Sequence, residues 1–183
     1  MQDPSARYSA VAITLHWLIA GLLLANIALG VWMHEAIDTV ASRGLAVSAY
    51  QLHKSLGLSI LALVALRLVW RLSHRPPPLP DAISRRQTWL ATGVHRGFYL
   101  LMLLVPLTGW LFVSTQWRGD TALNVETVWF DQFAVPHLFN LHRETDPVRQ
   151  SAAKLFADAH ALLALTMALL IALHIAAAIA HQW

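Results

Sequence analysis

The chain has 183 residues, of which 57% are hydrophobic and only 13% are charged, a balance too apolar for an ordinary soluble domain but suited to one integral membrane domain with several spans. It contains no cysteine, which excludes disulfides, iron–sulfur ligation and covalent c-type haem attachment. Its basic isoelectric point, near 9.8, does not indicate a nucleic-acid partner, because the basic residues cluster beside apolar runs, where membrane topology accounts for them.

Four apolar runs predict four membrane-spanning helices. In chain order these spans are residues 11–33, 52–72, 89–113 and 152–180. The shortest would be about 31 Å long as a helix, enough to cross a bilayer. Prolines between residues 76 and 80 forbid continuation of the second helix. After an outer loop, residues 115–145, Asp146 and Pro147 predict the N-cap and first turn of the fourth helix. The expected fold is an all-α, integral membrane four-helix bundle.

Basic residues are concentrated in and beside the second connection, where Asp81 is the lone acid. They are Arg67, Arg71, Arg75, Arg85, Arg86 and Arg96. Because cytoplasmic loops retain lysine and arginine, we expect this connection and both termini to be cytoplasmic. The first and third connections then face outward.

The fourth run carries His160 and His174 fourteen residues apart, which places them on one helix face about 21 Å apart along the axis. An unpaired histidine in so apolar a segment costs several kcal/mol, so each needs a partner. For one histidine, a hydrogen bond to a neighbouring helix is the simpler interpretation. Two at this spacing favour two haems, provided that the other helices supply matching ligands.

The same fourteen-residue interval sorts residues of all four helices into two layers. The outer layer contains His53, His160, Gly30 and Gly109, and the inner layer contains His16, His95, His174 and Arg67. Axial imidazoles would hold a planar macrocycle, glycines would give it room, and an arginine would suit its propionates. For either glycine alone, close helix packing is the alternative interpretation. The inner layer keeps three candidate histidines.

Two histidines per layer favour six-coordinate haem b over zinc, since no cysteine or intramembrane carboxylate stands at these depths. An iron with two histidine ligands has no open position, which favours electron transfer over oxygen chemistry. The chain has no Walker motif, dinucleotide fingerprint or nucleophile elbow, so hydride-transfer and nucleotide-driven mechanisms have no support.

Short motifs occur in a fixed order along the chain. They are Arg7-Tyr8, Leu15-His16-Trp17, His53-Lys54-Ser55-Leu56-Gly57, Arg67-Leu68-Val69-Trp70-Arg71, Gly93 through His95 to Pro106 and Gly109, then His160 and His174. In this order and spacing the chain resembles the bacterial cytochrome b561 family, four-helix dihaem proteins of the inner membrane, over nearly its whole length.

The resemblance implies that His16 and His174 ligate the inner haem and that His53 and His160 ligate the outer haem. His95 would then bind a propionate or a quinone, or take up a proton; a role as a satisfied polar residue is equally open.

The resemblance also implies electron exchange with the quinone pool. Some relatives oxidise superoxide at the periplasmic side and reduce ubiquinone, and others relay electrons for a separate soluble redox protein. The expected partners are membrane lipid, quinone, and superoxide or a soluble donor. Basic side chains on the outer side would steer the superoxide anion toward the outer haem. The outer loop also contains acidic residues, so its net electrostatic field is not clearly positive.

An aromatic and apolar segment, residues 129–139, is unusual for an exposed connection. We expect it to lie on the membrane surface or over the outer haem, with a protein-docking site and a quinone entrance as alternatives. It is an equally good interpretation that this segment lies at the membrane interface and has no chemical role.

Overall fold

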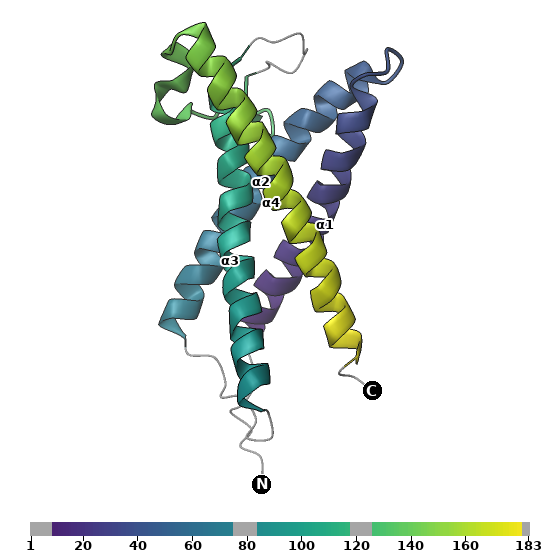
Figure 1. Cartoon of the computed structure of the whole chain (residues 1–183), viewed down its shortest axis with the longest axis vertical. Coiled ribbons are helices and arrows are strands. Elements are labelled where there is room, and N and C mark those ends of the chain that lie inside the picture. The colour runs from purple at the N-terminus through teal and green to yellow at the C-terminus, as the bar shows by residue number, and fades with distance from the viewer. Residues whose placement is uncertain (1–8, 75–83, 118–125, 181–183) are drawn as a thin grey trace.

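A computed structural model describes residues 9–74, 84–117 and 126–180. Four long helices dominate this part of the chain: α1 (Ala10–Ala36), α2 (Arg43–Ser73), α3 (Arg85–Ser114) and α4 (Asp146–Ala180). They run along the length of the molecule (Figure 1), and each is long and apolar enough to cross a membrane. The predicted all-α four-helix membrane bundle is confirmed.

Local side-chain chemistry determines where several helices begin. Ser9 Oγ accepts a hydrogen bond from the Ala12 amide at 3.2 Å, and Ser84 opens α3 with a capping box. Helix α4 contains Asp146 in its first turn, so it begins one residue earlier than predicted, a small difference for a helix end. The Asp146 carboxylate accepts from Arg149 at 3.2 Å.

Helix α2 begins at Arg43, well before the apolar run at residue 52, because its first turns bury Ala46 and Ala49. It ends at Ser73. The prolines predicted to stop it, residues 76–80, lie outside the described residues.

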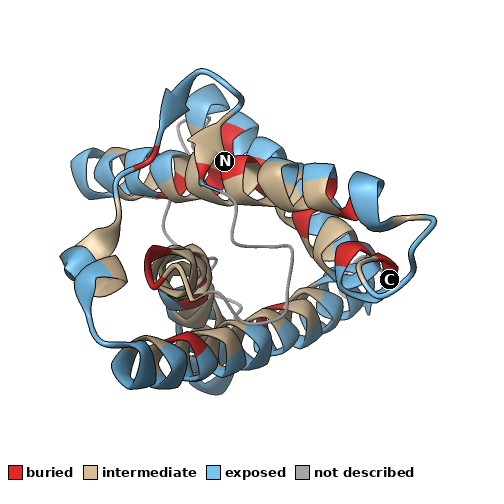
Figure 2. Cartoon of the chain, turned by 90° about the horizontal axis from the view of Figure 1, so that it is seen from above, coloured by how far each residue is buried: buried red, intermediate tan, exposed pale blue. Residues whose placement is uncertain are grey.

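The buried interior is small and apolar, and most of the surface is apolar too. Ile60, Val64 and Met167 are almost fully buried at its centre. Large apolar side chains such as Leu72 and Leu173 are 79% and 67% exposed, and exposed residues cover the outward helix faces (Figure 2). Such a surface is costly in water but matches lipid hydrocarbon. The chain is therefore a multi-pass membrane protein.

The helices pack unevenly. Helix α1 packs along α2, α3 packs along α4, and α2 also contacts α3. Within the described part of the chain, α4 makes no comparably extended contact with α1 or α2. Side chains of α4 that point toward α1 or α2 therefore face them across the interior of the bundle.

The connection between α3 and α4 folds onto one end of the bundle. It contains a hairpin of β1 (Val128–Trp129) and β2 (Phe133–Ala134), followed by a 3₁₀ helix, η1 (Leu138–Arg143). We call this end of the bundle the outer end. Ser55 Oγ of α2 accepts from the Phe130 amide at 3.0 Å, and Trp110 Nε1 of α3 donates to the Pro136 carbonyl at 2.9 Å. The hairpin was not predicted, because two-residue strands carry no detectable alternation of apolar and polar residues.

Candidate functional site

His53 of α2 and His160 of α4 form a facing pair in the outer half of the bundle. Their ring centroids are 6.1 Å apart and the ring planes are 82° from parallel. Two imidazoles bound to opposite sides of one metal, with metal–nitrogen distances of about 2 Å, would place their centroids roughly 6 Å apart. The structure thus brings the predicted outer pair together at a spacing at which the two imidazoles would be able to hold one metal.

Both rings are held through Nδ1. His53 Nδ1–H donates to the Asn26 carbonyl at 3.2 Å, and His160 Nδ1–H donates to the Val105 carbonyl at 2.8 Å. Because a carbonyl can only accept, Nδ1 carries a proton in each ring, and in the neutral ring Nε2 then keeps a free lone pair. A neutral imidazole oriented in this way is ready to bind a metal through Nε2.

Neither acceptor was predicted. The acceptors are the main-chain carbonyls of Asn26 and Val105. Neither offered a signal in the sequence, because every residue has a carbonyl and only the fold decides which one meets a histidine.

Gly30 and Gly109 lie directly against these two imidazoles. A Cβ atom at Gly30 would be 3.2 Å from His53 Cε1, and one at Gly109 would be 3.1 Å from His160 Cε1 and Nδ1. Each glycine therefore lets a ring from the neighbouring helix lie against bare backbone. The sequence suggested room for a macrocycle or close helix packing, whereas the contacts seen are with the histidine rings themselves.

The four inner-layer residues also gather in one region. His16 of α1 lies within electrostatic range of Arg67, His95 and His174. The rings of His95 and His174 are 6.4 Å apart between centroids and 72° from parallel, and Phe98 packs edge-on against His174 at 5.3 Å. Ring spacing alone therefore keeps His95 as a rival to His16.

Arg67 connects three helices at this level. Its Nη1 donates to the Ala12 carbonyl of α1 at 3.2 Å, and its Nε donates to Tyr99 Oη of α3 at 3.2 Å. Arg71 lies over the ring of the same tyrosine, 5.7 Å from its centroid. A guanidinium has five N–H donors, so Arg67 is suited to hold an anionic group such as a propionate as well.

A third pair of neighbouring histidines lies in the outer loop. The ring centroids of His137 and His142 are 4.8 Å apart, and Gln116 Nε2 donates to His137 Nε2 at 2.9 Å. Burial first, and then the neighbouring His142, lowers the pKa of His137 below its ordinary value, while Glu126 opposes the shift.

We expect the outer loop to loosen in acid. The pKa of His137 is lower in the folded chain than its unfolded value of about 6.5, so its contribution to stability is complete above that pH and is lost as the pH falls through it toward the folded pKa. A protonated His137 also cannot accept from Gln116. Amide exchange in residues 126–145, corrected for intrinsic rates, should be faster near pH 5 than near pH 8. Equal protection at both pH values would contradict this role, and His137→Gln should reduce the difference.

Comparison with known proteins identifies the family. A family model described as prokaryotic cytochrome b561 matches residues 7–183. The chain belongs to the prokaryotic cytochrome b561 family. The resemblance noted from the sequence is thereby confirmed, and membership in this cytochrome family implies that the chain binds haem b.

Three curated relatives are similar to the chain. Cytochrome b561 homolog 2 of Escherichia coli (strain K12) is 29% identical over 126 residues, which are 68% of this chain and 63% of that protein. Cytochrome b562 of Cereibacter sphaeroides is 35% identical over 122 residues, 66% of this chain and 72% of that protein. The probable superoxide oxidase CybB of Yersinia pestis is 33% identical over 108 residues, 56% of each chain. The similarity thus spans less than two thirds of the first and third relatives.

The outer pair fits a haem b. Its two Nε2 atoms are neutral donors in an apolar bundle, and the porphyrin of a haem supplies the other four nitrogens. Within the described ranges, no group of three or more histidine, cysteine or acidic side chains is placed to hold a metal ion without such a macrocycle. The two Nε2 atoms therefore match an iron whose other four ligands are the porphyrin nitrogens.

Gly109→Ala should disturb the outer site. The added methyl group would lie 3.1 Å from the His160 ring, so the ring must shift, at a cost of about 1–3 kcal/mol, and haem should be lost from the purified protein. The haem-to-protein ratio measures this loss. Gly93→Ala on the same helix is the matched control, because nothing lies within 4 Å of that position. Equal haem content in the two variants would contradict the expectation that haem binding depends on this contact.

Proposed function

We propose that this cytochrome holds two haems b, each between two histidines. His53 and His160 would ligate the outer haem, and His16 and His174 the inner one. The observation that carries the proposal is the His53–His160 pair, with rings 6.1 Å apart and both Nδ1 atoms committed to backbone carbonyls. Bound haem supplies one-electron chemistry, and the residues fix its position and orientation.

Helix packing supports His16 rather than His95 as the second inner ligand. His95 lies on α3, which packs along α4, and a macrocycle placed between His95 and His174 would have to separate these helices. His16 lies on α1, which makes no extended contact with α4 in the described structure. The outer pair has the same relation, because α2 and α4 also face each other without extended contact. Helix α4 would then contribute a ligand to both irons.

We further propose that the chain passes electrons between a donor at the outer end and the quinone pool. Two haems stacked along α4 would form a path through the bundle, with the buried Met167 between them. An iron with two histidine ligands keeps no open position, so it would exchange electrons without binding its partner. The arginine-rich second connection supports an inner-membrane protein with both termini in the cytoplasm.

Superoxide is the donor that we propose first, because one relative is named a probable superoxide oxidase. Two described cations of the outer end add little to a steering field, since Arg149 and Lys154 are each paired with an acid, Asp146 and Asp158. A soluble redox protein is the second candidate. Phe133 and Phe139, which are 58% and 79% exposed on the outer loop, favour it as an apolar docking surface.

The purified protein in liposomes containing ubiquinone tests both candidates. With superoxide as the sole donor, we expect ubiquinol to form in proportion to the haem content. Superoxide dismutase should abolish this reaction. Formation of ubiquinol only after a soluble reductant protein is added would support the second candidate, and none under either condition would contradict electron exchange with quinone.

A further inference from the structure

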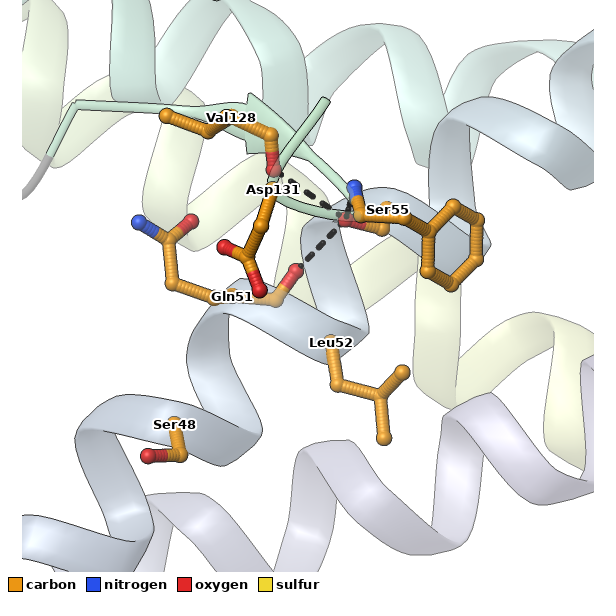
Figure 3. Close-up of a pocket in the computed structure, with 7 residues that line it drawn as sticks. Ser48, Gln51, Leu52, Ser55, Val128 and Asp131 are labelled. Carbon is orange, nitrogen blue, oxygen red and sulfur yellow. Dashed lines mark hydrogen bonds between the residues drawn. The ribbon is translucent and has the colours of Figure 1, made fainter. Parts of the chain in front are cut away.

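A cavity of about 210 Å³ lies at the outer end, between α2 and the hairpin (Figure 3). Gln51 and Leu52 of α2 form one wall, and Phe130 and Asp131 of the hairpin turn form the other. Leu52 directly precedes His53 in the sequence, so the cavity adjoins the helix segment that carries one outer ligand.

The walls are held firmly. Ser55 Oγ donates to the Gln51 carbonyl at 3.0 Å and accepts from the Phe130 amide at 3.0 Å, so one hydroxyl ties the helix to the turn. Phe130 and Asp131 both have positive φ, 42° and 59°, which is uncommon for residues with side chains. This conformation aims the Asp131 side chain at the cavity and toward Gln51 (Figure 3).

The polar groups of the cavity are mainly acceptors. Gln51 Nε2 donates to the Glu126 carbonyl at 2.7 Å, which fixes the amide so that Oε1 is the acceptor. This Oε1 atom is buried and has no hydrogen-bond partner among the described residues. The Asp131 carboxylate also accepts when it is ionised. A ligand that donates hydrogen bonds suits these groups, and an anion does not.

The edges of the cavity are apolar and accessible. Leu52 and Phe130 are 43% and 40% exposed beside the polar wall. A ligand for this cavity should therefore combine hydroxyl donors with an aromatic ring and an apolar tail.

We propose that the cavity binds the hydroquinone head of a membrane quinol, whose hydroxyls donate to Gln51 Oε1 and the Asp131 carboxylate. The proposal rests on the proposed exchange with the quinone pool and deepens it by placing the reduced form at the outer end. Because the oxidised quinone has carbonyls and no hydroxyl donors, the cavity distinguishes the two redox forms.

Binding of ubiquinol-1 to the holoprotein tests this site. Anaerobic equilibrium dialysis is carried out on chemically reduced protein, which cannot accept electrons from the quinol. Oxidised protein is dialysed separately against ubiquinone-1. Asp131→Asn should weaken ubiquinol-1 binding about tenfold, because a neutral amide accepts more weakly than a carboxylate, and should change ubiquinone-1 binding less than about threefold. Asp38→Asn removes an exposed acid outside the cavity and should change neither affinity.

A second variant fills the cavity. Leu52→Trp should abolish ubiquinol-1 binding while the reduced-minus-oxidised haem spectrum keeps its shape and intensity. Wild-type affinity for ubiquinol-1 in both Asp131→Asn and Leu52→Trp would overturn the site. If both variants bind ubiquinol-1 with wild-type affinity and still reduce ubiquinone in liposomes, the proposed function stands and the site alone is wrong. Absence of any electron exchange between wild-type protein and quinone would instead refute the proposed function.

Discussion

His53→Ala is expected to lower the haem content from about two haems per chain to about one. Without this imidazole the proposed outer iron would lack one of its two protein ligands, and the described helices offer no replacement at that depth. His160 would keep its hydrogen bond to the Val105 carbonyl and would face an empty position. Haem extraction with quantification against protein measures the loss, and the remaining visible spectrum should be that of a low-spin haem.

The control for this variant is His34→Ala. His34 is an exposed histidine in the last turn of α1 and is not a proposed ligand. It should keep both haems. Retention of two haems in His53→Ala would contradict the outer pair, and loss of the inner haem alone would reverse the assignment of the layers.

His16→Ala and His95→Ala should differ sharply. We expect His16→Ala to lose the inner haem, because α1 faces α4 across the interior and His16 is the proposed partner of His174. We expect His95→Ala to keep both haems, since His95 lies on α3, which packs along α4, so that a macrocycle between His95 and His174 would have to separate these helices. The haem-to-protein ratio and the redox titration of the two variants provide the comparison.

The opposite result would assign His95 to the iron. The 6.4 Å spacing of the His95 and His174 rings makes this a sharp test, because it resembles the spacing of the outer pair. A shifted potential with unchanged haem content in His95→Ala would show a residue that acts on the haem without ligating it.

Apolar runs and histidine spacing predicted the fold and the two residue layers. A membrane span needs a minimum number of consecutive apolar residues, and the residues on one helix face recur at fixed intervals. The spans and the layers can therefore be recognised from short stretches of sequence. His53 and His160 could be paired in this way before any contact was known.

The features that the sequence could not supply depend on contacts between helices. Asn26 and Val105 orient the histidines through main-chain carbonyls, which no residue type encodes. The contact of Gly109 with the His160 ring depends on how closely α3 approaches α4. The cavity beside Gln51 arises only where the turn at Asp131 folds back onto α2. Each of these follows from tertiary packing rather than from a local pattern.

The most direct test of the two-haem proposal is a reduced-minus-oxidised visible spectrum of the purified chain together with haem quantification. Two low-spin haems b per chain are expected, and they should be separable by redox titration because the two layers differ in their surroundings. One haem per chain, or none, would contradict the proposal.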